Sequence, residues 1–166
     1  MSSNNEWRKD FLLKIIRYAK EARDAGYIVA PGAVAAQAAL ESAFGTSKLS
    51  TDGNNLFGIK ATKSWDGPVV EYETKECING EWITITARFR KYESWRECVF
   101  DYAKIINRLP WYRDAVDAAR VGDDIGFING LLASEKQPGW ATDPKYAEKI
   151  KRIMDKYNVQ TLVKAV

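Results

Sequence analysis

Residues 31–45 read PGAVAAQAALESAFG, and this stretch predicts a helix that runs from Pro31 to Phe44. Proline suits the first turn of a helix, because the N–H that it lacks would have no partner there. Gly45 is suited to end the helix, since glycine readily adopts the left-handed conformation that follows many helices. The segment is rich in alanine, so neighbouring elements can approach it closely.

One acidic residue breaks the apolar face of this helix. Val34, Ala38 and Glu41 follow the spacing i, i+4, i+7, which places Glu41 on the face that should be buried. Glu41 also lies in the last turn, at the negative end of the helix dipole. Burial and the dipole both disfavour the ionised carboxylate, so both raise its pKa, and a general acid needs a carboxyl group that stays protonated near neutral pH. The alternative is a glutamate that reaches into solvent from the edge of the face.

Most of the remaining chain is predicted to be helical. One helix begins near Asn5 and ends before Gly26, and a capping box at residues 94–97 opens another that stops at Pro110. Further helices are expected over residues 111–120, 124–134 and from 143 to about 158, whereas residues 45–68 are expected to form a loop.

A β-hairpin is predicted over residues 69–89. The segments 69–78 and 81–89 are rich in β-forming residues, and the Asn-Gly pair between them favours a tight two-residue turn. Such a turn pairs Glu76 with Ile83 and Glu71 with Arg88. The predicted fold class is therefore α+β, a mostly helical body with a small antiparallel lobe inserted after the second helix.

The register separates the acidic residues of the hairpin. Glu76 falls on a mostly apolar face, which should point toward the part of the protein that the sheet covers. Glu71 and Glu73 fall on the opposite, solvent-exposed face. Two alternatives stay open: Glu76 is solvated near the hairpin tip, or a slip of one residue exchanges the two faces. A protonated Glu41 that faced Glu76 across a cleft would have the arrangement that glycoside hydrolysis needs.

Composition narrows the chemistry further. The chain has 166 residues, the size of one domain, and contains no histidine, which excludes a Ser-His-Asp triad, a Cys-His pair and a His-ligated zinc site. The net charge of +3 is spread without a basic tract, so nucleic-acid binding is not indicated. No apolar run approaches the roughly 18 residues of a membrane span. Cys77 and Cys98 are expected to be free thiols, although a single bridge stays open.

Four motifs occur in order along the chain: AALESAFG at 38–45, NLFGIK at 55–60, FRKY at 89–92 and ATDPKY at 141–146. In this order they resemble the glucosaminidase domain of glycoside hydrolase family 73 over roughly residues 8–158. That family contains bacterial autolysins, the flagellar peptidoglycan hydrolase and some phage endolysins. Four spaced motifs make the resemblance specific, where any one alone would be weak.

The resemblance implies a lysozyme-like α+β fold with a substrate cleft beside the hairpin lobe. It implies hydrolysis of the β-1,4 bond after N-acetylglucosamine in peptidoglycan, without metal or cofactor. Glu41 matches the family's acid, and Glu76 matches its second glutamate, with Glu73 as the fallback. Trp140 stands where the family often has tyrosine, and Trp140 and Tyr146 are the predicted substrate-binding residues. The alternative is that both aromatic side chains only pack the last helix onto the body.

The sequence also predicts the domain organisation and the biological role of the protein. Residues 1–166 are predicted to form a single catalytic domain, with a core of about 8–158 and no separate wall-binding domain. The first residues, Met1–Glu6, lack the features of a secretory signal, so synthesis in a cytoplasm is expected. The expected protein is a monomeric phage or prophage endolysin that acts on peptidoglycan glycan strands after release, with no nucleic-acid partner and no stable membrane association.

Two competing functions remain at the sequence level. One is a lytic transglycosylase or muramidase that acts on the same polymer, and the other is a non-catalytic wall-binding module. The second catalytic step is open as well. Carboxyl groups about 6.5–9.5 Å apart predict inversion through a bound water, whereas a wider separation leaves the N-acetyl group of the substrate as nucleophile.

Overall fold

Helix α2 (Pro31–Ser42) lies at the centre of the molecule in the computed structural model, which describes residues 3–166. It contacts α1, α6, α7 and α8, and every residue from 31 to 39 is buried. The alanine-rich sequence explains this position, because small side chains let four helices approach one axis. The predicted start at Pro31 is confirmed. The helix ends two residues earlier than predicted, since Ala43 already adopts a left-handed conformation with φ 49°.

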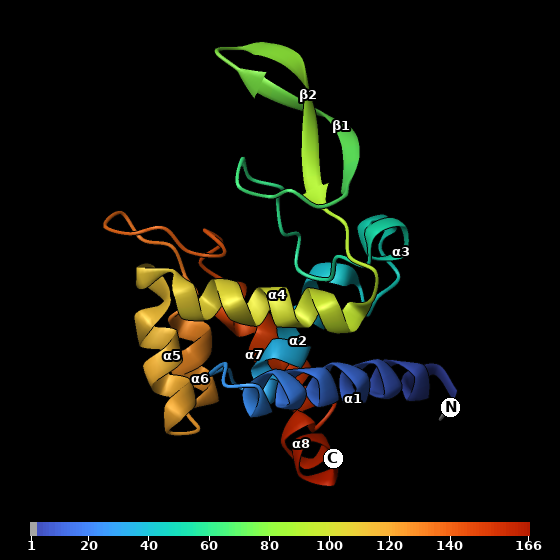
Figure 1. Cartoon of the computed structure of the whole chain (residues 1–166), viewed down its shortest axis with the longest axis vertical. Coiled ribbons are helices and arrows are strands. Elements are labelled where there is room, and N and C mark those ends of the chain that lie inside the picture. The colour runs from blue at the N-terminus through green and yellow to red at the C-terminus, as the bar shows by residue number, and fades with distance from the viewer. Residues whose placement is uncertain (1–2) are drawn as a thin grey trace.

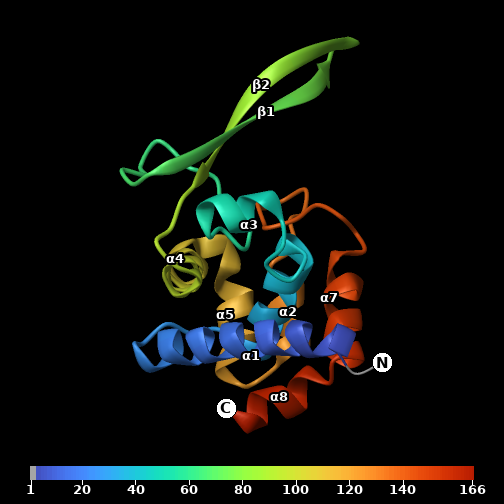
Figure 2. The same ribbon diagram turned by 90° about the vertical axis from the view of Figure 1, so that its right-hand side faces the viewer.

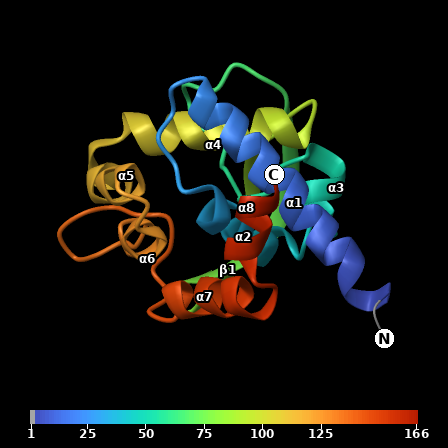
Figure 3. The same ribbon diagram turned by 90° about the horizontal axis from the view of Figure 1, so that it is seen from below.

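The other helices surround α2 and form the body of the molecule. Figure 2 shows α1 running across the lower part of the body, with α8 beneath it and α7 to one side. Figure 3, from below, shows α8 in front of α2 and α1 running diagonally past them. Their bounds are α1 Ser3–Asp24, α3 Lys48–Gly53, α4 Trp95–Arg108, the 3₁₀ helix η1 Pro110–Tyr112, α5 Arg113–Arg120, α6 Asp124–Asn129, α7 Tyr146–Lys156 and α8 Val159–Ala165.

The start of α4 confirms the predicted capping signal. The hydroxyl oxygen of Ser94 accepts a hydrogen bond from the backbone N–H of Glu97 at 3.1 Å. The Glu97 carboxylate in turn accepts from the backbone N–H of Glu93 at 3.1 Å, one residue before the cap. One N–H of the first turn and the N–H before the cap thereby gain partners, which fixes where the helix begins.

Three helical segments differ from the prediction. Residues 48–53, expected to be loop, form the short helix α3, which is capped by Ser47. The segment predicted over 124–134 is helical only as far as Asn129. The last predicted helix, from 143 to about 158, is α7, which begins three residues later than predicted and ends at Lys156. It is followed by α8, a helix that the sequence did not predict, after Asn158, whose backbone is left-handed with φ 50°.

The β-hairpin has the predicted register. Strands β1 (Val69–Ile78) and β2 (Glu81–Arg90) pair in antiparallel fashion, with Glu76 opposite Ile83 and Glu71 opposite Arg88. Asn79 and Gly80 both have positive φ values, 52° and 82°, as a tight turn of the primed type requires. The hairpin projects from the body, with its turn far from the helices in both side views (Figures 1 and 2).

The predicted fold class, mostly helical with a small antiparallel hairpin, is confirmed. Cys98 is buried in the body and Cys77 is exposed on the hairpin, and both are free thiols, as expected. Within residues 3–166, no helix is both long and apolar enough to span a bilayer. Met1 and Ser2, which open the stretch that lacks a secretory signal, lie outside the described residues.

Candidate active site

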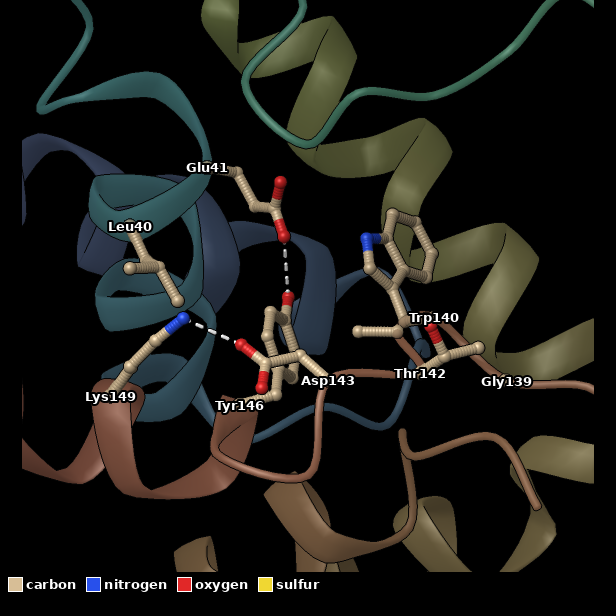
Figure 4. A pocket seen from close by; sticks show the side chains of 9 residues that line it. Leu40, Glu41, Gly139, Trp140, Thr142, Asp143, Tyr146 and Lys149 are labelled. Atoms are coloured by element: carbon tan, nitrogen blue, oxygen red, sulfur yellow. Dashed lines mark hydrogen bonds and ion pairs between the residues drawn. The ribbon is translucent and has the colours of Figure 1, made fainter. Parts of the chain in front are cut away.

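Glu41 lies where α2 emerges from the body. Its side chain borders a cavity of about 480 Å³, which is otherwise formed mainly by residues 139–149. The prediction that Glu41 is buried on a helix face was wrong in that form, because α2 is enclosed on all sides up to residue 39 and Glu41, beyond that point, is exposed. Figure 4 shows its carboxylate directed at Tyr146, with Trp140 on the opposite side of the cavity from Lys149.

A chain of hydrogen bonds holds the Glu41 carboxylate from behind. The Tyr102 hydroxyl donates to Oε1 of Gln37 at 2.5 Å, and Nε2 of Gln37 donates to the Tyr146 hydroxyl at 3.0 Å. The Tyr146 hydroxyl donates to Oε1 of Glu41 at 2.8 Å. Gln37 and Tyr102 are fully buried and Tyr146 is 4% exposed, so water does not compete for these bonds.

Two opposing influences act on the Glu41 carboxyl group. Partial burial against its neighbours is the larger and raises its pKa above the ordinary value of 4.5, whereas the hydrogen bond from Tyr146 lowers it. The residue is open to solvent, yet its carboxyl group is enclosed enough for desolvation to prevail. The predicted direction is confirmed, and desolvation is the cause.

The backbone turns sharply directly after Glu41. Ala43, Phe44 and Gly45 all adopt left-handed conformations, with φ values of 49°, 56° and 80°. The Ser42 hydroxyl donates to Ala38 O at 2.6 Å and accepts from the Gly45 N–H at 2.9 Å, so it binds the turn to the helix. A Cβ atom at residue 45 would lie 2.7 Å from the Trp95 ring, which explains why glycine stands there.

The NLFGIK motif connects the hairpin base to the site. Buried Asn55 donates to the carbonyl oxygens of Ile59 and Arg90, both at 2.9 Å, and so joins the loop to the end of β2. Phe57 stacks on Tyr102 with ring centroids 4.1 Å apart, and its carbonyl oxygen accepts a 3.3 Å hydrogen bond from the Trp140 indole. The motif therefore positions the wall of the cavity.

The two predicted substrate-binding aromatics differ in what they offer the cavity. Trp140 is half-buried and packs against the rings of Phe57, Tyr102 and Tyr112, with its other edge along the cavity. Tyr146 has a buried ring, and the structure places its hydroxyl at Glu41. Both line the same cavity as Glu41, and their role in binding substrate stays a prediction.

Asp143 is an acidic residue of the cavity that the sequence did not single out. Its carboxylate accepts hydrogen bonds from Lys149 Nζ at 2.6 Å and from the backbone N–H of Lys145 at 2.9 Å. These two bonds, the Lys149 bond foremost, hold the pKa of Asp143 below its usual range. Asp143 is therefore an ionised group that holds the loop before α7 in place. The Asp-Pro sequence at 143–144 was the signal that could have identified this residue.

Glu76 lies apart from this cavity. It is exposed near the turn of the projecting hairpin, and Glu73 is exposed on the same strand. The face that carries Glu76 is directed at the body at its base, where Tyr72 donates a 3.0 Å hydrogen bond to Asp52 of α3. The opposite face carries the exposed 3.2 Å ion pair between Arg88 and Glu71. The structure does not bring Glu76 to Glu41, so its role stays a prediction.

The residues that sequence analysis missed are Gln37 and Tyr102. Gln37 precedes Glu41 by four residues, so the two share one side of α2. A single polar residue among the alanines of this helix was the sequence signal that could have identified it. Tyr102 lies on a different helix, and no local pattern links it to residue 37. Within residues 3–166, no cluster of three or more acidic or cysteine side chains could hold a metal ion.

Comparisons with known proteins identify the family of this chain. The glucosaminidase family, described as mannosyl-glycoprotein endo-beta-N-acetylglucosaminidase, matches residues 16–159. The chain is 38% identical over 146 residues to the peptidoglycan hydrolase FlgJ of Salmonella typhimurium, covering 86% of this chain and 44% of that protein. It is 37% identical over 138 residues to the exo-glucosaminidase LytG of Bacillus subtilis, covering 80% of this chain and 46% of that protein.

A solved structure confirms the fold. The catalytic domain of the autolysin Auto from Listeria monocytogenes superposes with a TM-score of 0.75 at 30% identity, covering 95% of this chain and 88% of that domain. The chain spans less than half the length of the two curated relatives above. The expected resemblance to glycoside hydrolase family 73 and its lysozyme-like fold is thereby confirmed. This chain belongs to the glucosaminidase family of glycoside hydrolases.

Proposed function

We propose that this chain is a peptidoglycan hydrolase that cleaves the β-1,4 bond after N-acetylglucosamine, at internal positions of the glycan strand. The observation that carries the proposal is the Glu41 carboxyl group, which has a raised pKa and is held by a buried tyrosine at the edge of an open cavity. The FlgJ relative, named a peptidoglycan hydrolase, supports the substrate. The family description, an endo-beta-N-acetylglucosaminidase, supports cleavage at internal positions, whereas LytG is named an exo-glucosaminidase.

Glu41 acts as the general acid in the first step. Its proton passes to the glycosidic oxygen as the bond to the anomeric carbon breaks, and the shortened strand leaves as a neutral alcohol. Tyr146 keeps the carboxyl group pointed at that oxygen, because its hydroxyl is itself fixed by Gln37. Trp140 borders the cavity on the far side from Lys149 and offers the face or edge of an indole to a sugar ring.

The second step uses the N-acetyl group of the substrate. Glu76 does not line the cavity, which favours attack by the acetamido oxygen on the anomeric carbon over a water held between two carboxylates. Glu41, now ionised, then removes a proton from water as that water opens the cyclic intermediate. Two displacements at one carbon retain its configuration. Glu76 contributes to catalysis at a distance, as a negative charge close to a glycan strand that is bound beneath the hairpin.

Product analysis of digested cell wall tests the proposal. We expect internal fragments with reducing N-acetylglucosamine ends and retained anomeric configuration, identified by mass spectrometry and by NMR of the first product formed. Anhydro-muramic ends would show a lytic transglycosylase, reducing muramic ends would show a muramidase, and binding to wall without release of sugar would show a non-catalytic module. Release of single terminal sugars would contradict cleavage at internal positions.

The Glu41→Gln variant tests the acid itself. We expect it to fold and to lose about 10²–10⁴-fold in rate, the usual contribution of a general acid. Glu148→Gln, at an exposed position on α7, is the matched control and should keep full activity. Lytic activity retained by Glu41→Gln would remove Glu41 from the mechanism.

We also propose the biological setting expected from the sequence, a monomeric phage or prophage endolysin. Its test is expression inside the bacterial host with and without a pore-forming protein. An endolysin should clear the culture only when the pore is present, whereas lysis without a pore would contradict this role.

A further inference from the structure

A second cavity adjoins the first on the other side of Trp140. Its volume is about 610 Å³, larger than that of the cavity at Glu41, and the two share Gly139 and Trp140 as lining residues. Its remaining walls come from the loop that enters the hairpin (58–64), the end of α4 and the 3₁₀ helix η1. Gly139 and Trp140 therefore stand between two neighbouring cavities, one of which holds Glu41.

The second cavity is positively charged. Lys60 and Arg108 line it and are exposed, no aspartate or glutamate lines it, and among the ion pairs of residues 3–166 neither cation takes part. A third cation, Arg90, is already occupied, since its Nη1 is 2.9 Å from the Asp101 carboxylate. Two exposed side chains, one from the loop that enters the hairpin and one from the end of α4, are thus free to bind an anionic group.

The rest of the lining is apolar and held in place. Leu109 and Trp111 are half-buried and face the cavity from the segment after α4, with Tyr112 buried behind them. The opposite wall is anchored by Arg90, whose Nε donates to the carbonyl oxygen of Lys60 at 3.2 Å. A preformed apolar wall with a few polar groups at its margin is the usual form of a site for an amphipathic ligand.

We propose that this cavity binds the carboxylate-bearing peptide branch of peptidoglycan, on the sugar next to the one held at Glu41. The inference rests on the proposed function, because peptidoglycan is the glycan whose alternate sugars carry such a branch. The branch combines alkyl side chains with free carboxylates, which match the apolar wall and the ammonium and guanidinium groups of Lys60 and Arg108. Neutral sugars alone would leave both cations without partners.

Paired substrates test the site. Glycan strands that carry their peptide branches are compared with the same strands after an amidase has removed the branches. We expect the wild-type chain to have a higher kcat/KM on branched strands. Lys60→Gln and Arg108→Gln should each lower the ratio of branched to stripped kcat/KM by about two- to fivefold, the scale of an exposed ion pair.

Matched controls remove the same charges elsewhere. Lys14 and Arg17 are exposed on α1, on the side of the body away from the hairpin, so Lys14→Gln and Arg17→Gln should leave the ratio unchanged (Figure 2). An unchanged ratio in Lys60→Gln and Arg108→Gln would overturn the proposal. So would an equal fall of the ratio in the α1 controls, which would show an effect of net charge alone.

A binding measurement separates this site from the proposed function. A soluble muramyl tripeptide with free carboxylates is titrated into the whole chain, and indole NMR signals, assigned with Trp111→Phe, report its binding. We expect the Trp111 signal to shift, with weaker binding in Arg108→Gln than in Arg17→Gln. A Trp111 signal that stays unmoved at millimolar tripeptide would overturn the site even if the wall is cleaved, and a shift without any wall cleavage would support the site while the proposed function fails.

Discussion

At the scale of single residues, the chemistry depends on how one carboxyl group is enclosed. Glu41 is exposed enough to meet a substrate, yet burial against its neighbours still raises its pKa. The Tyr146 hydroxyl opposes that shift, because a hydrogen bond donated to a carboxylate stabilises the ionised form. The Tyr146 side chain therefore both aims the acid and limits how strongly it holds its proton.

The Tyr146→Phe variant separates these two effects. Loss of the hydroxyl should raise the pKa of Glu41 further, so the acid stays protonated to higher pH. In a plot of kcat/KM against pH, the descending limb should therefore shift to higher pH. Because the carboxyl group also loses its orientation, kcat should fall by roughly tenfold or more. Tyr27→Phe, in the half-buried loop after α1, is the control. A limb that stays in place or moves to lower pH would contradict the role assigned to Tyr146.

At the scale of elements, the hairpin shows how local signals set a register. The Asn-Gly turn and the alternation of apolar residues were enough to predict the register between Val70–Phe89 and Ile78–Glu81, and the structure adds the pair Val69–Arg90. The direction in which the hairpin leaves the body is a separate matter, set by contacts at its base such as the hydrogen bond between Tyr72 and Asp52. Those contacts are remote in sequence from the turn.

Glu76 and Glu71 form a matched pair for testing the hairpin. They lie on the same strand, both are exposed, and they point to opposite faces. We expect Glu76→Gln to lower the rate of wall hydrolysis by about tenfold, since its charge lies on the face directed at the body, and Glu71→Gln to have little effect. Equal effects, or a larger effect of Glu71→Gln, would show that the Glu76 face does not act on the substrate.

At the scale of the whole molecule, one buried amide connects three helices. Gln37 of α2 accepts from Tyr102 of α4 and donates to Tyr146 of α7, so the body and the active site share one network. The same side chains support Glu41, which means that packing of the core and alignment of the acid are coupled.

The Gln37→Met variant measures this coupling. Methionine keeps the length and volume of glutamine but leaves the buried Tyr102 hydroxyl without its acceptor, which costs about 1–3 kcal/mol. We expect a lower free energy of unfolding in denaturant titrations, together with reduced activity. Gln137→Met, at an exposed loop position, should change stability by less than about 0.5 kcal/mol. An unchanged stability of Gln37→Met would show that the network does not hold the helices together.

Several features of this protein follow from the sequence alone. The central helix, the capped start of α4, the hairpin register and Glu41 as the candidate acid each depend on signals within a few residues: proline and glycine positions, a Ser-x-x-Glu box, an Asn-Gly turn and helical spacing. Such signals act through local backbone geometry, so they can be recognised before any tertiary contact is known.

Other features depended on the tertiary structure. Glu41 is exposed because α2 is enclosed by four helices and only its last turn emerges, which the spacing of its own residues cannot show. The network through Gln37, Tyr102 and Tyr146, the separation of Glu76 from Glu41 and the charged cavity beyond Trp140 all join or divide residues far apart in sequence. Only the packing of whole elements determines such distances, because no local backbone preference encodes them.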